Sequence, residues 1–165
     1  MNWAYFHLAI NHFPIIGTII GTLLLVAGFT TNHKGIKISG LGTLVFAVLM
    51  AIVAFLTGNP AEEAMKAIPE VAKSLVSRHE EIASVGMYIL IPTGLLAALT
   101  LYSIWKNEKS VRSLMIITLA LSLISSAAMV YVGRTGGQIR HSEFHGESVK
   151  QYMILHQNDK EEDED

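Results

Sequence analysis

The sequence predicts an all-α integral membrane protein, a four-helix bundle whose helices run alternately up and down. Three observations predict this fold: 51% of the 165 residues are hydrophobic, only 16% are charged, and the charges are segregated along the chain. No Asp, Glu, Lys or Arg occurs in residues 1–33, 38–61, 82–105 or 113–133. Each window can cross a bilayer core of about 30 Å as a helix, since backbone polar groups in lipid must pair within their own segment.

We expect one domain over residues 1–141, with spans at about 4–29, 39–58, 80–105 and 113–135. The first run lacks the basic start and the small-residue cleavage site of a signal peptide, so we interpret it as a mature helix. The longer loop over residues 59–79 is expected to hold one amphipathic helical piece after Pro60. Residues 142–165 are polar and end in DKEEDED, a composition typical of a disordered acidic tail.

The two short connections between spans are basic, and they carry Lys34, Lys37, Lys106, Lys109 and Arg112. The longer loop over residues 59–79 dilutes its basic residues with glutamates. Short loops rich in Lys and Arg stay in the cytoplasm, so we expect both termini on the outer side, in the periplasm of a bacterium. The sequence therefore predicts a multi-pass protein of the bacterial inner (cytoplasmic) membrane.

The composition also excludes several kinds of site. The chain has no cysteine, which excludes disulfides, iron–sulfur clusters, thiolate metal sites and the attachment of a c-type haem. A net charge of −2 gives no support for nucleic-acid binding. No nucleophile–base arrangement stands out, so no catalytic residue is assigned.

Four histidines are expected to gather at the outer end of the bundle. His7 and His12 begin the first span, His79 begins the third, and His141 follows the fourth. At 100° per residue, His7 shares a helix face with a stripe of polar and small residues, whereas His12 points roughly 140° away. Matching stripes of mostly small residues occur on the other spans, and they let helices or a flat cofactor approach closely. The stripes are Asn11, Pro14, Thr18 and Thr22; Thr43, Ala47, Ala54 and Gly58; His79, Gly86, Leu90, Gly94 and Ala97; Ser122, Ser126, Met129, Gly133 and Gly137.

Neutral imidazole is the commonest nitrogen ligand for metals, so this cluster predicts a cofactor site. Two histidines from opposing helices could hold the iron of haem b, with Asn11 nearby and with the propionates paired to Arg78, Arg134 and Arg140. The alternative is a bare Cu, Fe or Zn ion. Its ligands would come from His7, His12, His79, His141, Glu80 and Glu143. Met50, Met87 and Met129 are interpreted as lipid-facing or core residues, and the serines of the fourth span as packing residues.

Four motifs, HLAINHFP, LTGNPAEEA, RHEEIA and GGQIRHSE, occur in this order around the apolar spans. As a group they resemble a family of small predicted bacterial four-helix membrane proteins of unknown function, which are loosely similar to cytochromes. The resemblance covers roughly residues 1–143. It implies that the signature positions are His7, Asn11, His12, His79, Glu80, Arg140, His141 and Glu143. It implies no established activity, so the chemistry stays open.

We expect a membrane b-type haem subunit in respiratory electron transfer, with the haem site near the periplasmic face. Its partners would be quinol or a periplasmic electron carrier, and other subunits of a respiratory complex. One alternative is a non-haem membrane protein that binds a metal through His and Glu. The other is a non-catalytic accessory subunit of a larger membrane complex. A stand-alone enzyme is favoured less than an electron-transfer or accessory role.

Overall fold

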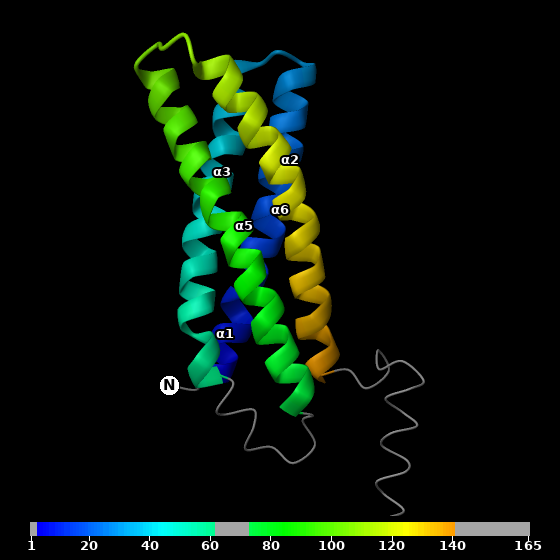
Figure 1. The fold of residues 1–165 in the computed structure, drawn as a ribbon. Coiled ribbons are helices and arrows are strands. Elements are labelled where there is room, and N and C mark those ends of the chain that lie inside the picture. Colours follow the sequence, from blue (N-terminus) through cyan, green and yellow to red (C-terminus); the bar gives the residue numbers. More distant parts are fainter. Residues whose placement is uncertain (1–2, 62–72, 141–165) are drawn as a thin grey trace, which may run out of the picture.

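The computed structural model describes residues 3–61 and 73–140, which are almost entirely helical (Figure 1). A short helix, α1 (Trp3–Ile10), leads into α2 (His12–Thr30), and a tight turn connects α2 to α3 (Lys34–Leu56). The chain continues with α5 (Lys73–Trp105) and α6 (Val111–Arg140), which are also joined by a tight turn. Residues 58–61 are helical as well, and no strand occurs within the described ranges.

The four long helices form an up-down bundle in which each helix packs against two others. α2 and α5 both contact α3 and α6, so α2 lies diagonally opposite α5, and α3 lies opposite α6. α1 begins and α6 ends at one end of the bundle, while the turns after α2 and α5 lie at the other, which we call the turn end (Figure 1). The predicted all-α, up-down architecture is confirmed.

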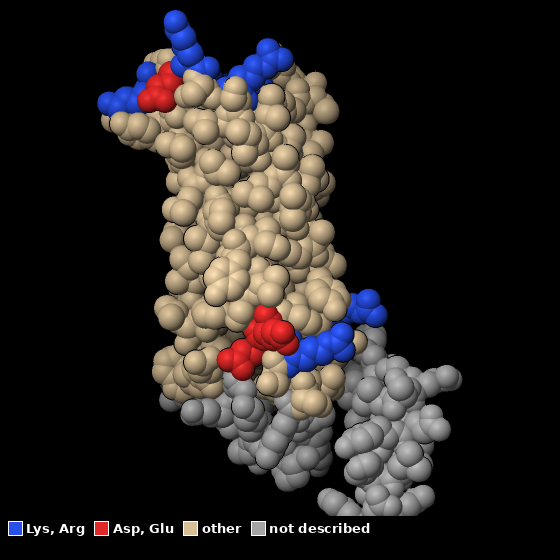
Figure 2. Space-filling view, in the orientation of Figure 1, with Lys and Arg blue, Asp and Glu red and all other residues tan. Residues whose placement is uncertain are grey.

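The surface of the bundle is that of a membrane protein. Within the described residues, four helices are long and apolar enough to cross a membrane: Tyr5–Thr30, Lys34–Leu56, Ser74–Trp105 and Val111–Ile139. Large apolar side chains cover their outer faces, and Leu56 and Leu95 are 71% and 67% exposed. On the face drawn in Figure 2, the charged side chains lie at the two ends with an uncharged belt between them. The chain is thus a multi-pass membrane protein with four candidate spans.

The last two long helices extend beyond the spans that the sequence predicts at 80–105 and 113–135. α5 has 33 residues, which corresponds to about 50 Å at the rise of an α-helix. The hydrocarbon core is about 30 Å thick, so α5 projects out of it. Because α5 begins at Lys73, His79 lies inside this helix rather than at its start. Most of the predicted 59–79 loop and the predicted tail lie outside the described residues.

The first span is interrupted at Asn11, between α1 and α2. The cause is Pro14, which has no backbone N–H and whose ring clashes with the carbonyl of Ile10, four residues earlier. The chain direction is kept across the break, since Asn11 N donates to His7 O at 2.9 Å. The carbonyl of Pro14 accepts a hydrogen bond from the buried Thr18 hydroxyl. One apolar span is therefore built from two helices.

α2 and α3 approach so closely that their backbones touch. A Cβ atom added to Gly40 would lie 2.9 Å from Gly21 O and 2.9 Å from Leu25 N, and one added to Gly21 would lie 3.1 Å from Gly40 O. Transmembrane helices gain little from the hydrophobic effect when they associate, so small residues that allow close packing are favoured at their interfaces. These two glycines set the distance between the first two spans.

Buried hydroxyl groups connect the helices across the bundle interior. Thr22 Oγ1 of α2 lies 3.0 Å from Ser126 Oγ of α6. Thr93 Oγ1 of α5 lies 2.7 Å from Ser125 Oγ of α6. Hydrogen bonds of this kind between helices contribute to the association of transmembrane helices. Ser125 and Ser126 of the fourth span therefore act as packing residues, as the sequence predicts.

The predicted small-residue stripes face the bundle interior. The buried residues include members of all four stripes, and the other stripe members are partly buried. The buried members are Pro14, Thr18, Thr22, Ala47, Ala54, Gly86, Leu90, Gly94, Ala97, Ser122 and Met129. Periodicity within each helix was sufficient to orient these faces, because a regular helix repeats its side-chain directions every 3.6 residues.

We predict that Gly40→Ala destabilises the protein, because its Cβ would meet backbone atoms of α2 that cannot move independently. Overpacking of this kind costs about 1–3 kcal/mol. A lower midpoint of thermal unfolding in detergent measures the effect. Gly42→Ala is the matched control, since no atom lies within 4 Å of a Cβ added there. Equal midpoints for the two variants would contradict the assignment of Gly40 as a close-contact residue.

Candidate functional site

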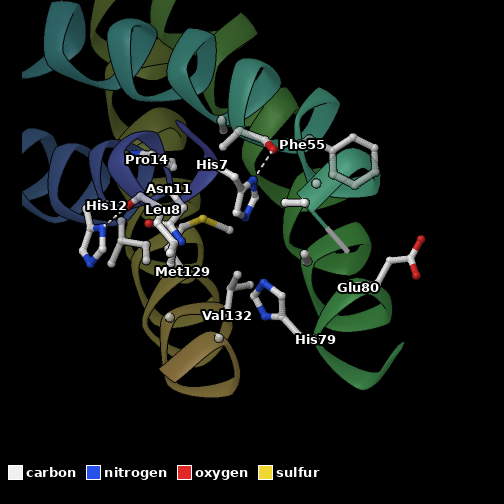
Figure 3. A pocket seen from close by; sticks show the side chains of 18 of the residues that line it. His7, Leu8, Asn11, His12, Pro14, Phe55, His79, Glu80, Met129 and Val132 are labelled. Atoms are coloured by element: carbon white, nitrogen blue, oxygen red, sulfur yellow. Dashed lines mark hydrogen bonds between the residues drawn. The ribbon is translucent and has the colours of Figure 1, made fainter. Parts of the chain in front are cut away.

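A cavity of about 390 Å³ lies at the end of the bundle opposite the turn end. Side chains from all five helices line it, and most of them are apolar or small (Figure 3). Among the described residues that line it, Glu80 alone is charged, and its side chain is exposed. The cavity is therefore an apolar chamber whose polar groups are few and placed individually.

His7 projects from α1 into this cavity, with one ring nitrogen held by α3. Its Nδ1 lies 3.0 Å from Ala54 O and 3.2 Å from Thr57 Oγ1. A carbonyl only accepts hydrogen bonds, so Nδ1 carries the proton and donates to it. The Thr57 hydroxyl donates to a carbonyl of its own helix, Val53 O at 3.0 Å or Ala54 O at 2.9 Å, and is free to accept from His7. The neutral ring thus has a bare Nε2.

His79 projects from α5 and is held by α6 in the same manner. Its Nδ1 lies 2.9 Å from Thr135 Oγ1. The Thr135 hydroxyl lies 2.9 Å from Val132 O and donates to it. Since a hydroxyl has a single proton, Thr135 accepts from His79, and Nδ1 is again the protonated nitrogen. The Nε2 atom of His79 is left without a proton in the neutral ring.

A Thr–Gly pair follows the same pattern beside each histidine. Gly58 and Gly136 come directly after Thr57 and Thr135. A Cβ added to Gly58 would lie 3.9 Å from His7 Cε1, and one added to Gly136 would lie 3.1 Å from His79 Cε1. The bundle consists of two helical hairpins, one formed by α1, α2 and α3 and the other by α5 and α6. Each hairpin supplies a histidine from its first helix, and a threonine hydroxyl and a glycine from the end of its last helix.

The two imidazole rings point toward one another across the cavity (Figure 3). They come from diagonally opposite corners of the bundle, because α1 leads into α2, and α2 lies opposite α5. With both Nδ1 atoms donating to oxygen atoms behind the rings, the two Nε2 atoms are directed to the space between them. An electrophile bound in that space would meet a nitrogen lone pair from each side.

The other predicted residues on α1 and α2 are placed differently. His12 lies at the margin of the cavity, is exposed, and its Nδ1 contacts Leu8 O at 3.0 Å. Its ring points away from His7 (Figure 3), as its angular separation on the helix predicts. Asn11 lines the cavity, and its Oδ1 is buried with no hydrogen-bond partner in the described part of the chain.

Of the predicted charged side chains that the structure describes, only that of Glu80 lines the cavity. Glu80 turns away from both rings (Figure 3). Arg78 and Arg134 are exposed and do not line the cavity. Within residues 3–61 and 73–140, no three His, Cys, Asp or Glu side chains form a group that could hold a metal ion. His141 and Glu143 lie outside the described residues, as does the side chain of Arg140.

Sequence reasoning missed Thr57 and Thr135 at this site. Met87 and Met129 line the cavity and also pack in a hydrophobic core cluster, which agrees with their interpretation as core residues. Thr57 and Thr135 hold the histidines but were not singled out. The chain has three Thr–Gly pairs, at Thr57–Gly58, Thr93–Gly94 and Thr135–Gly136. Only the first and the last hold a histidine of the cavity, so the pair alone does not single them out.

We predict that Thr135→Val releases the ring of His79 without unfolding the bundle, because valine keeps the shape but lacks the oxygen that accepts from Nδ1. The lost hydrogen bond costs about 0.5–1.5 kcal/mol. Nitrogen NMR of labelled histidines in the cofactor-free protein should show one Nδ1–H tautomer for His79, and a mixture in the variant. Thr31→Val is the control, because the exposed Thr31 hydroxyl donates only to Ala27 O at the turn end. A wild-type His79 protonated at Nε2 would contradict this geometry.

Comparisons with protein-family models, with curated proteins and with solved structures give no match for this chain. The resemblance that the four motifs suggest therefore stays a prediction. The chain is an all-α protein with four candidate membrane spans, and its site is defined by its own geometry.

Proposed function

We propose that the protein is a membrane b-type haem subunit, in which His7 and His79 supply the two axial ligands. One observation carries the proposal. Two imidazole rings from diagonally opposite helices face each other in one apolar cavity, and the Nδ1 atom of each ring is hydrogen-bonded to an oxygen atom of a neighbouring helix. A metal-ligating histidine almost always donates its other ring N–H to an oxygen, which fixes the tautomer and the ring orientation. Both histidines have such an Nδ1 contact, to Ala54 O and to Thr135 Oγ1.

The lining of the cavity fits a flat apolar macrocycle. Its volume of about 390 Å³ falls within the range of about 300–1,000 Å³ that is typical of small-molecule and cofactor sites. Gly58, Gly133, Gly136 and Gly137 line it, so backbone rather than side chains borders much of the space. A Cβ added to Gly137 would meet no atom within 4 Å. These residues leave room beside the two rings.

A haem in this position would supply one-electron transfer. The chain's contribution would be to hold the two imidazole rings, to exclude water with apolar side chains, and to keep charges at the mouth. The exposed Arg78 and Arg134 lie next to His79 and Thr135 in the sequence, so propionates that reach the mouth would meet them there. Quinol or a periplasmic carrier would be the electron partner, within a larger respiratory assembly.

The distribution of basic residues supports an orientation for this site. The turn end carries Lys34, Lys37, Lys106, Lys109 and Arg112 in the turn after α5 and in the first residues of α3 and α6. Under the positive-inside rule this end faces the cytoplasm of a bacterial inner membrane. The cavity and the start of α1 would then face the periplasm.

A copper site is the second candidate, and the position of two thioethers favours it. Met87 and Met129 line the same cavity as His7 and His79. Thioether and imidazole ligands suit monovalent copper. A site of His and Glu ligands is favoured less, because the side chain of Glu80 is exposed and turns away from both histidines (Figure 3). An accessory subunit without a cofactor is the third interpretation. Purified protein that contains neither haem nor copper would support it.

We predict that wild-type protein extracted in mild detergent shows the sharp reduced α-band of low-spin haem. His7→Ala and His79→Ala should each lower the haem-to-protein ratio at least about tenfold, since even loss of an outer partner of a ligand costs 10–100-fold in affinity. Absorption spectra and a haem assay on equal amounts of folded protein measure this. The apolar spans are unchanged, so membrane insertion should persist.

His12→Ala is the matched control for these variants, because its exposed ring points away from the cavity. Its spectrum and haem content should equal those of the wild type. Full haem content in His79→Ala would remove His79 from the ligand pair. Copper in place of haem in the wild type would favour the second candidate.

We also predict the orientation of the bundle. Glu81→Cys, an exposed position on α5 near the cavity, should react with a membrane-impermeant maleimide added to intact cells. Asn107→Cys, in the turn between α5 and α6, should react only after permeabilisation. Both variants should label fully in permeabilised cells, which controls for reactivity. Labelling of Asn107→Cys from outside would reverse the proposed topology.

A further inference from the structure

A second concave site lies at the turn end, at the opposite end of the bundle from His7 and His79. This groove has a volume of about 370 Å³ and lies between the turn after α2 and the turn after α5. Its apolar wall consists of Ile104, Val111 and Met115, and its polar lining includes Lys34 and Lys37. The groove thus combines an apolar wall with ammonium groups, as the junction between a lipid headgroup and its acyl chains would require.

The two lysines present their charges differently. Lys37 is fixed: its Nζ donates to Asn32 Oδ1 at 2.9 Å and lies 5.3 Å from the centre of the Phe29 ring. Lys34 is exposed, and no hydrogen bond or ion pair engages it within the described part of the chain. An ammonium group has three donors, so each lysine keeps N–H groups for an anion.

The surroundings of the groove add positive charge. The two turns and their flanks carry five Lys and Arg side chains and a single carboxylate, that of Glu108, which itself lines the groove. Figure 2 shows the basic side chains gathered at this end. Glu108 Oε2 accepts hydrogen bonds from Ser103 Oγ at 3.1 Å and from Ser110 Oγ at 3.1 Å. Its carboxylate is therefore held by its own turn rather than by Lys34 or Lys37.

Aromatic residues place the groove at the level of lipid headgroups. Tyr102 and Trp105 are 50% and 73% exposed at the end of α5. Lys106 Nζ lies 4.6 Å from the centre of the Trp105 ring and 5.8 Å from that of Tyr102. Exposed Trp and Tyr side chains concentrate at membrane–water interfaces, and lysines there reach the headgroups. A phosphate at this depth would lie within reach of the groove.

We infer that this groove is a binding site for an anionic phospholipid, with the headgroup phosphate against Lys34 and Lys37. The first acyl carbons lie along Ile104 and Val111. The inference is independent of the proposed haem function, since the groove shares no residue with the cavity. Basic pockets between transmembrane helices are known to recognise anionic headgroups, and each Lys near the surface adds attraction to them.

The test is lipid-dependent thermal unfolding of the purified full-length protein in detergent. Phosphatidylglycerol should raise the unfolding midpoint, and phosphatidylcholine at the same concentration should not. Lys34→Gln and Lys37→Gln should each weaken the apparent affinity about fivefold, and the double variant should lose most of the stabilisation. The shift in the unfolding midpoint is measured for each variant relative to the same variant without added lipid. A variant that is merely less stable therefore does not show a smaller lipid-induced shift for that reason.

The matched control is the double variant Lys109→Gln with Arg112→Gln, which removes the same charge from the same end but from residues outside the groove. It should keep most of the lipid effect. Equal losses in both double variants would overturn the proposal, because general electrostatic attraction would then explain the binding. Inorganic phosphate that matches phosphatidylglycerol would also overturn it, in favour of a site for a free anion.

Discussion

The structure depends on how helices are held together in lipid, where burying apolar side chains between helices gains little free energy. In lipid, close packing and hydrogen bonds between helices take the place of the hydrophobic effect. The Gly21–Gly40 contact supplies the first for α2 and α3, and the Thr93–Ser125 pair supplies the second for α5 and α6. At the cavity end the His–Thr pairs continue this role within each hairpin. The site is therefore part of the same set of contacts that assembles the bundle.

Helical periodicity predicted which faces of the spans turn inward. His7 and Thr18 share one face of the first span, and the structure buries Thr18 fully and turns His7 into the cavity. The angle of 100° per residue also places His12 on a different helix face from His7, and His12 is exposed. It also applies to Glu80, because a neighbour in sequence is rotated about 100° from His79. Helix geometry alone could therefore have removed Glu80 from the set of inward-facing ligands.

The partners of the histidines could not be predicted from one helix at a time. His7 meets Thr57, and His79 meets Thr135, across helix pairs whose relative rotation depends on packing. Met129 has the same difficulty, because an apolar side chain on a buried face can fill the core or line a cavity. Of the three Thr–Gly pairs in the sequence, the structure places two beside a histidine of the cavity, and nothing in the sequence separates these two from Thr93–Gly94. The His–Thr contacts depend on how two helices are rotated relative to each other, which the residue pattern of a single helix does not contain.

Each hairpin contributes one histidine, so any ligand that joins the two Nε2 atoms also joins the two halves of the bundle. Neither nitrogen has a proton in the neutral ring, and each is an acceptor in an apolar cavity. A ligand that accepts an electron pair from the Nε2 atom of His7 and from that of His79 would satisfy both polar atoms and would bridge α1 to α5. Binding to the folded state alone stabilises it by mass action. Occupancy of the cavity should therefore strengthen the contact between hairpins that otherwise rests on α2 with α6 and α3 with α5.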